Sequence, residues 1–401
     1  MTQTIAPVSQ KNRIEILDVI RGFAIFGILL ANIQSWSGYK FIPFEHMATL
    51  PYYNYNEILH YLFMFFIDTK FYALFSILFG IGFYLQFQRH RDNQAPFIAT
   101  YRKRLAYLML FGAIHAFFWS GDILFIYGAI GFIFILFRNL QTQKLLLLSI
   151  FLYYSWLLYD IIFALYFPQV MNYEHSAYKT YPDISPHELV AIFQNGNFIE
   201  VLQANWHNLY YRYIDLIPSG RLTKVLALFL FGYYLMTINY FTTYAKSFKL
   251  FILFFLTGSI FTFFAYEVGG SMASFSHDLS NIAYKALAVT GQILLALSYI
   301  NFLSILYQNL SIQKVLHLFA YVGRMSFTNY LMHTLFGYLI FYPFFGGHFG
   351  TMGLLEITIL AFILYIIQVI FSFMWLKYFR FGPLEWVWRS LTYQKLFPIR
   401  K

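Results

Sequence analysis

Leu17–Trp36 reads LDVIRGFAIFGILLANIQSW, and this stretch decides the fold class of the chain. A helix that rises about 1.5 Å per residue crosses the hydrocarbon core of a bilayer in about 20 residues. Asp18, Arg21 and Asn32 interrupt the apolar run. At about 100° per residue, Arg21 and Asn32 lie about 20° apart around the axis, and Asp18 lies about 40° from Asn32. Charges in membrane spans face a bundle interior or a water-filled cavity, so this polar stripe predicts the inside of a helix bundle.

The composition is that of a polytopic membrane protein. Of 401 residues, 60% are hydrophobic, 23% aromatic and only 11% charged, far less charge than a soluble domain carries. The net charge of +10 comes mostly from short loops between apolar runs, as membrane topology requires, and does not indicate a nucleic-acid partner. The chain has no cysteine, which excludes disulfides, thiolate metal sites and cysteine nucleophiles.

Hydropathy and length predict an all-α bundle of about ten transmembrane helices in contact with the lipid bilayer. A further helix near 56–67 is short enough to be interfacial. The ten predicted spans lie near 17–36, 69–88, 102–119, 122–138, 143–167, 221–241, 249–267, 284–307, 325–345 and 353–376.

The distribution of Lys and Arg predicts that both termini face the cytoplasm. We expect no cleaved signal peptide, because Asp18 and Arg21 interrupt the start of the first span. Three regions follow from the spans: an N-terminal bundle over 1–167, an external region over 168–220 in which 187–203 is expected to form a short helix, and a C-terminal membrane domain over 221–401.

Two segments at the start of predicted spans are similar to each other. Lys70–Phe75 reads KFYALF and Lys224–Phe229 reads KVLALF, and each soon reaches a Phe-Gly pair. The similarity suggests an internal repeat, although chance in so biased a composition explains it equally well.

Polar residues are expected to converge near the outer mouth of the bundle. His115 lies eleven residues beyond Arg104, as Asn32 lies eleven beyond Arg21, so both sit about 16 Å along their helices at similar depth. Asp122 follows a tight Ser-Gly turn after the third span, and Asp68 and Lys70 open the second span from the same side. A histidine beside a carboxylate can act as a general base, so His115 and Asp122 are candidate catalytic residues with Asn32.

Each of these residues also has a structural interpretation. His115 can serve as a packing residue hydrogen-bonded to a carbonyl or a tyrosine, and Asp122 can cap the fourth helix. Asp18 and Arg21, three residues apart, can neutralise each other. Asp68 and Lys70 can act as interfacial anchors.

The ninth span carries a second polar group. Arg324 precedes it, and Asn329 and His333 lie four apart on one face, where they either bind substrate or join helices. Glu385 and Arg389 form an i, i+4 pair in an amphipathic tail helix expected along the inner membrane surface. The sequence has no zinc-protease spacing, phosphate-binding loop, dinucleotide fingerprint or nucleophile elbow, and we predict no metal site.

The order of motifs resembles the YeiB-like bacterial membrane proteins, which carry a domain of unknown function (DUF418) in their second half. The similarity begins with ILDVIRGFAIFGILLAN over Ile16–Asn32. Further matches are Lys70–Ser76, Leu78–Gly80, Gly112, His115, Gly121–Leu124, Gly323–Ser326, Thr328–Tyr330 and Phe381–Glu385.

This resemblance implies a distant relation to the acyltransferase-three proteins and to heparan glucosaminide acetyltransferase, which move acyl groups from cytoplasmic acyl-CoA to acceptors such as sugars. Their first span carries a similar arginine with a His or Asn eleven residues later. Here the pair is Arg21 and Asn32. The acyltransferase-three pattern has His at the second position, so this chain departs from it. A base must then come from elsewhere, and His115 is the candidate.

The leading hypothesis is therefore an acyltransferase-like membrane protein with acyl-CoA as co-substrate and no tightly bound cofactor. Arg21, the basic cluster at 102–104 and Arg324 would meet the donor phosphates, His115 would deprotonate a glycan or lipid-linked acceptor, and Asn32 or Asn329 would bind the oxyanion. The alternatives are a transporter or transport-associated protein and a bundle that scaffolds partners without catalysis. The sequence leaves turnover and oligomeric state open.

Overall fold

The computed structural model describes residues 14–42, 44–166, 186–216, 219–269 and 282–401. Every regular element in these ranges is a helix, and the extended backbone there forms one isolated bridge, between Phe379 and Arg400. The predicted all-α class is confirmed. The polar lead over 1–13 and most of the proline-rich part of the external region, 167–185, lie outside the described residues.

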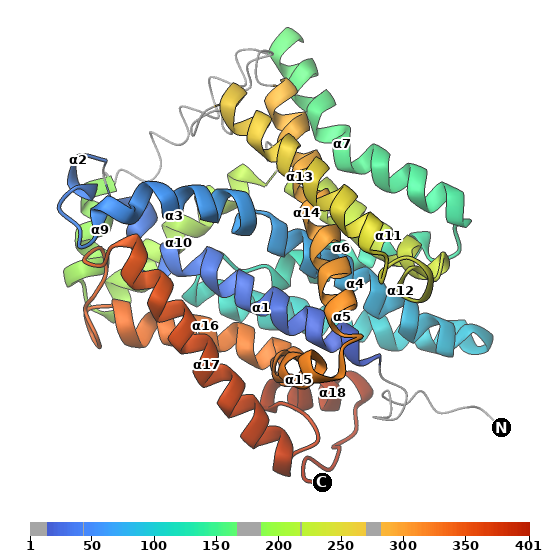
Figure 1. Cartoon of the computed structure of the whole chain (residues 1–401). Coiled ribbons are helices and arrows are strands. Elements are labelled where there is room, and N and C mark those ends of the chain that lie inside the picture. The colour runs from blue at the N-terminus through green and yellow to red at the C-terminus, as the bar shows by residue number, and fades with distance from the viewer. Residues whose placement is uncertain (1–13, 43, 167–185, 217–218, 270–281) are drawn as a thin grey trace.

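A helix lies over each of the ten predicted ranges (Figure 1). The first half contains α1 (Glu15–Trp36), α4 (Lys70–Arg89), α5 (Gln94–Phe118), α6 (Leu124–Phe134) and α7 (Thr142–Tyr166). The second half contains α11 (Arg221–Thr237), α13 (Phe248–Gly269), α14 (Ile282–Leu306), α16 (Ser326–Phe341) and α17 (Leu354–Tyr378).

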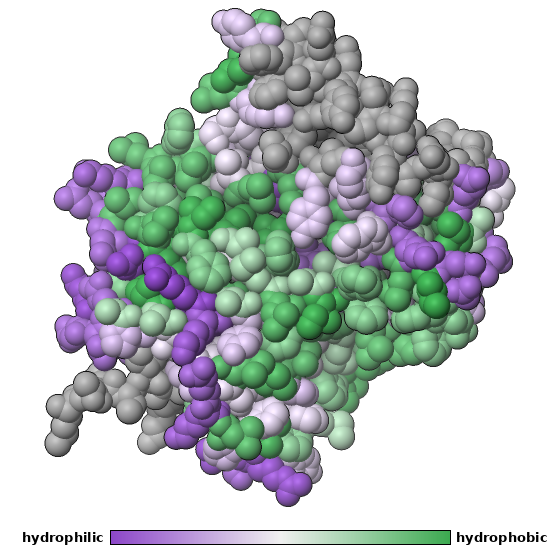
Figure 2. Space-filling view, turned by 180° about the vertical axis from the view of Figure 1, so that it is seen from behind, coloured by the Kyte–Doolittle hydropathy of each residue, from purple (hydrophilic) through white to green (hydrophobic). Residues whose placement is uncertain are grey.

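Five helical stretches among the described residues are long and apolar enough to cross a membrane. They are Glu15–Trp36, Tyr53–Arg89, Phe248–Glu267, Ile282–Leu306 and Leu354–Tyr378. Figure 2 shows a broad apolar surface with hydrophilic residues gathered along its sides. Helix α17 also exposes apolar side chains, those of Ile359, Phe362, Ile363 and Ile366. Exposed apolar area of this extent requires lipid around it, so the chain is a membrane protein.

Shorter helices lie between the long ones. The predicted interfacial helix is α3 (Asn56–Leu62) and continues as a π-helical turn over Phe63–Ile67. The single helix expected over 187–203 is instead two, α9 (Pro186–Asn195) and α10 (Phe198–Asp215). Helix α10 begins after Asn197 because the Asn197 side chain caps it and Glu200 completes a capping box.

The last two short helices are α15 (Leu310–Arg324) and α18 (Pro383–Tyr393). The tail helix was predicted, whereas α15 was not. Asn309 caps α15 by accepting hydrogen bonds from the backbone N–H groups of Ser311 and Ile312, which is the local signal that could have found it. We call the end of the bundle that holds the start of α1, the end of α4 and α18 the basic end. The opposite end holds α9 and α10 (Figure 1).

The two similar segments lie in α4 and α11, which pack against each other. Arg221 stacks over Tyr72 near the start of both helices, and Phe79 stacks on Phe229 at 4.2 Å between ring centroids, so the helices run the same way. Each places its glycine against the backbone of the other: a Cβ on Gly80 or Gly232 would lie 2.0 Å from a carbonyl oxygen of its neighbour. Small residues permit such contacts between membrane helices.

A second glycine contact joins α1 to α15. A Cβ on Gly22 would lie 1.9 Å from the carbonyl oxygen of Phe319, and one on Gly323 would lie 1.9 Å from that of Asp18. The backbones therefore touch at this crossing. The contact brings Arg324, the last residue of α15, to the same end of the bundle as Arg21.

Candidate functional site

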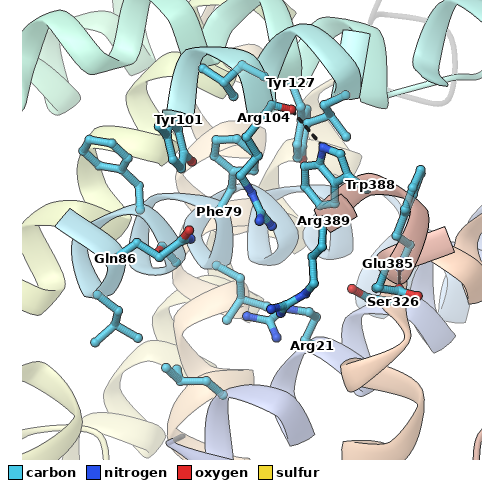
Figure 3. Close-up of a pocket in the computed structure, with 18 of the residues that line it drawn as sticks. Arg21, Phe79, Gln86, Tyr101, Arg104, Tyr127, Ser326, Glu385, Trp388 and Arg389 are labelled. Atoms are coloured by element: carbon cyan, nitrogen blue, oxygen red, sulfur yellow. Dashed lines mark hydrogen bonds between the residues drawn. The ribbon is translucent and has the colours of Figure 1, made fainter. Parts of the chain in front are cut away.

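A cavity of about 280 Å³ opens at the basic end, and arginines from five helices line it. They are Arg21 on α1, Arg89 on α4, Arg104 on α5, Arg324 on α15 and Arg389 on α18. The acidic residues in its lining are Asp18 and Glu385. The side chains of Arg21, Arg104 and Arg389 point into the same space (Figure 3). We call this space the arginine cavity.

Asp18 and Arg21 form the ion pair that their spacing suggested, with 2.7 Å between Oδ1 and Nη1. The arginine side chain is nevertheless 26% exposed and lines the cavity. Neutralisation and cavity lining are therefore compatible roles for Arg21. The donor-phosphate hypothesis placed Arg21, the 102–104 cluster and Arg324 together. The structure brings Arg104 and Arg324 to the cavity of Arg21, whereas Arg102 and Lys103 are exposed and do not line it.

The tail helix α18 forms one wall of the cavity. Trp388 donates its indole N–H to the carbonyl oxygen of Arg104 at 2.9 Å, and the Arg104 guanidinium stacks over the Trp388 ring at 3.8 Å. Such a stack stabilises an arginine while leaving N–H groups for an anion. Arg89 and Arg389 were not assigned to this site by the sequence, because nothing in their local patterns shows that α4 and α18 meet there.

Glu385 joins α18 to the start of α16 through hydrogen bonds. Its carboxylate accepts hydrogen bonds from the backbone N–H groups of Phe327 and Thr328 at 2.7 and 3.0 Å, and from the Thr328 hydroxyl at 2.6 Å. These donors favour the ionised form. Burial outweighs them, so the pKa of Glu385 lies above its ordinary value.

The inner part of the arginine cavity is apolar and aromatic. Its lining there comes from α4, α5, α6 and α16 and comprises Phe75, Leu78, Phe79, Leu105, Leu108, Leu124, Tyr127 and Tyr330. A cavity with arginines at one end and apolar side chains at the other suits an amphipathic ligand with an anionic head.

His115 and Asp122 meet as predicted. His115 Nδ1 lies 2.7 Å from Asp122 Oδ1, and Nε2 lies 2.8 Å from the Thr334 hydroxyl. An ionised carboxylate only accepts hydrogen bonds, so Nδ1 donates to Asp122, and in the neutral imidazole Nε2 is the acceptor for the Thr334 hydroxyl. His115 and Asp122 are only 5% and 4% exposed. The second carboxylate oxygen accepts from the backbone N–H of Phe125 at 2.8 Å, so Asp122 both orients the imidazole and caps α6.

Tyr330 connects the arginine cavity to this pair. It lines the cavity, and its ring centroid lies 5.3 Å from that of His115. The hydroxyl accepts a long hydrogen bond of 3.3 Å from the backbone N–H of Ile123. One aromatic side chain thus borders both the cavity and the imidazole.

Helix α10 approaches the pair from the opposite end of the bundle. Asn205 anchors it by donating to the carbonyl oxygens of Ala116 and Phe117 and by accepting from the Ser120 N–H. Burial raises the pKa of Tyr213, the nearby Asp122 carboxylate raises it further, and Arg212 lowers it. Neither Tyr213 nor Arg212 was predicted near this pair, although the capping pattern of α10 marked its helix.

Asn329 and His333 share a face, as predicted, and it is turned toward α17. The Asn329 side-chain amide donates to the Ser372 hydroxyl at 2.9 Å, and His333 Nε2 lies 3.1 Å from the amide oxygen of Gln368. Gln368 in turn donates to the Asn329 carbonyl oxygen at 2.8 Å. These contacts favour the interpretation in which the two residues join helices.

Three residues predicted near the outer mouth make no hydrogen bond or ion pair with His115 in the described chain. Lys70 is buried and donates its ammonium group to the carbonyl oxygen of Met64, in the π-helical turn. Asp68 is half-buried at the end of that turn. Asn32 is half-buried and makes no side-chain hydrogen bond to any described residue. The described residues also contain no cluster of three His, Cys, Asp or Glu that would hold a metal ion.

Comparison with known proteins places the chain in a family. It is 30% identical over 422 residues to "Uncharacterized protein YxaH" of Bacillus subtilis (strain 168), which covers 99% of this chain and 98% of that protein. Residues 222–395 match the family described as "Protein of unknown function (DUF418)". The chain belongs to the DUF418 family. This confirms the YeiB-like resemblance found in the sequence.

Two more relatives of this DUF418 protein cover nearly its whole length. It is 29% identical to "Uncharacterized 39.9 kDa protein in amylase 3'region" of Bacillus acidopullulyticus, over 98% of this chain and 97% of that protein. It is also 29% identical to "Uncharacterized protein YeiB" of Escherichia coli (strain K12), over 94% of this chain and 95% of that protein. No solved structure matches the chain significantly.

Proposed function

We propose that this DUF418 protein is a membrane-bound acyltransferase that moves an acyl group from cytoplasmic acyl-CoA to a hydroxyl or amine of a cell-envelope acceptor, most simply a glycan. The proposal includes ten transmembrane helices in the bacterial plasma membrane, with both termini and the basic end in the cytoplasm. The helix over each predicted span and the concentration of Lys and Arg in alternate loops support this topology.

The observation that carries the proposal is the arginine cavity and its inner boundary. Five arginines face two acidic residues in its lining. A cluster of arginines in a partly buried cavity favours a ligand with several negative charges. The apolar inner part reaches Tyr330, whose ring contacts His115. A phosphate-bearing donor held at the basic end would therefore direct its acyl thioester toward the imidazole.

The chain supplies the groups for acyl transfer in the following order. The acceptor hydroxyl or amine first replaces the Thr334 hydroxyl at His115 Nε2. Nε2 then takes the proton of the acceptor as the acceptor oxygen or nitrogen attacks the thioester carbonyl carbon. The carbon–sulfur bond then breaks, and the proton on Nε2 passes to the departing CoA thiolate. Asp122 holds the opposite nitrogen protonated and stabilises the imidazolium that forms in between.

The test compares two buried histidines in one chain. Purified protein in lipid nanodiscs is incubated with radiolabelled acetyl-CoA and envelope glycans, and labelled acceptor and released CoA are measured. We expect His115→Gln to lower transfer by about 10²-fold or more, the contribution of a positioned general base. His333→Gln keeps the contact region of α16 with α17 polar and is expected to retain transfer within about tenfold.

The outcomes separate the two function classes. Equal transfer by His115→Gln and the parent protein would contradict the acyltransferase mechanism. Movement of an unmodified labelled solute across proteoliposomes, without a covalent product, would instead support the transporter hypothesis.

A further inference from the structure

We propose that the Tyr330 side chain is a movable wall between the arginine cavity and the His115–Asp122 pair. Tyr330 lines the cavity on one side, and its ring lies 5.3 Å from the His115 ring on the other. The inference concerns the route to His115 and not the transferred group, so it goes beyond the proposed function and is tested separately from it.

The proposed transfer at His115, on which this inference rests, requires a wall that moves, because the imidazole is closed in on all sides. His115 is 5% exposed, and both of its ring nitrogens already have partners, Asp122 and Thr334. Nothing reaches Nε2 from the cavity unless an intervening side chain leaves. Tyr330 is the cavity-lining residue with a ring contact to His115 among the described residues.

The contacts that hold Tyr330 are suited to a reversible movement. Its hydroxyl has a single long hydrogen bond of 3.3 Å, from the Ile123 N–H. The remaining ring contacts are aromatic, with Trp119 at 6.5 Å and His333 at 6.3 Å between centroids. Losing one long hydrogen bond at the surface of a cavity costs little, because cavity water or a ligand can replace it.

Helix geometry places the route directly behind the ring. Tyr330 and Thr334 lie four residues apart on α16 and therefore share one face. Thr334 is the residue whose hydroxyl lies 2.8 Å from His115 Nε2. Truncation of Tyr330 would join the cavity to Thr334 and to the imidazole in one continuous space.

Because the chain has no native cysteine, access from the cavity to Thr334 can be measured by cysteine labelling, without any enzymatic assay. Thr334→Cys introduces one buried thiol, and its reaction with a small anionic methanethiosulfonate reagent is followed by mass spectrometry in nanodiscs. In this background, Tyr330→Ala is expected to raise the labelling rate at least tenfold. Tyr330→Phe keeps the ring and is expected to stay close to the parent rate.

A matched control removes a large side chain from the same helix without opening the route. Leu335→Ala truncates a side chain that is 54% exposed on the outside of the bundle, and it should leave labelling of Thr334→Cys unchanged. Tyr330→Leu provides a second variant that preserves apolar packing. It is expected to give an intermediate rate if Tyr330→Ala does not elute as a single folded species.

The charge of the reagent identifies the entrance. Entry through the arginine cavity predicts faster labelling by the anionic reagent than by a cationic one of similar size, and Arg104→Gln should reduce that preference. The proposal is overturned if well-folded Tyr330→Ala and Tyr330→Leu both label at the parent rate, or if the cationic reagent is as fast in the opened variants. Loss of acyl transfer without a change in labelling would bear on the proposed function and not on the route to His115.

Discussion

The arginine cavity and the His115–Asp122 pair are adjacent but differ in almost every physical respect. The cavity is open at the basic end and carries more arginines than carboxylates. The pair is closed, and its imidazole is satisfied on both sides. An excess of one charge in a partly buried space is stabilised by an external ion of opposite sign, whereas a satisfied pair needs no ligand. For the proposed function, this difference means that donor binding and proton transfer are divided between two compartments.

The two buried histidines, His115 and His333, also differ in the charge of their hydrogen-bond partners. His115 forms a hydrogen bond through Nδ1 to the Asp122 carboxylate, which in the proposed mechanism stabilises the imidazolium. His333 faces the neutral amide of Gln368 between two packed helices. Only the first environment is suited to acid–base chemistry.

The largest effect is expected from a substitution that breaks the His115–Asp122 pair while preserving the fold. Asp122→Asn can still accept from the Phe125 N–H as a helix cap, but it lacks the negative charge that stabilises a protonated His115. We expect transfer to fall about 10²-fold, with a thermal midpoint near that of the parent.

Asp122→Ala is the matched comparison for this experiment, because it loses the cap as well. It should destabilise the protein by about 1 kcal/mol in addition to losing activity. Transfer by Asp122→Asn at the parent rate would show that Asp122 acts as a cap alone.

A smaller effect is expected at the arginine cavity. Arg104→Gln removes one cation from its lining and should weaken acyl-CoA binding about tenfold, since a charge-assisted hydrogen bond contributes about 1.5–3 kcal/mol. Isothermal titration at two salt concentrations measures the change. Arg102→Gln, two residues away with an exposed side chain, is the control and should leave the affinity within about twofold. Equal weakening by both variants would indicate a general surface-charge effect.

The smallest expected effect is a pH dependence of the protein's stability that comes from Glu385, in the wall of the cavity. The pKa of Glu385 is raised by burial, so the folded protein binds this proton more tightly than the unfolded chain. Its contribution to stability is then fully present below the ordinary carboxyl pKa and is lost as the pH rises through the raised value. The thermal midpoint of the parent relative to Glu385→Gln should fall by about 2 °C over that interval. A difference that grows with pH would show that the hydrogen bonds to Phe327 and Thr328 outweigh burial.

The positions of the long helices were largely predictable, because hydropathy and length are properties of contiguous residues. The predicted 284–307 corresponds to α14 (Ile282–Leu306), and 353–376 to α17 (Leu354–Tyr378). The contact of His115 with Asp122 was also predictable from depth along two consecutive helices joined by a tight turn. The same reasoning grouped Lys70 with them, yet its ammonium group turns back to the carbonyl oxygen of Met64. Depth along a helix does not specify the direction in which a side chain points.

The sequence by itself determined that this chain is an all-helical membrane protein with polar residues inside, since long apolar runs must satisfy their backbone within helices and must bury their charges. Only the tertiary structure decided which of those residues meet. Arg21, Arg104 and Arg389 share one cavity, and Tyr330 stands between it and His115. The reason is physical: such meetings depend on how distant helices rotate and cross, as at the contact of Gly22 with Phe319, and no local pattern encodes that packing.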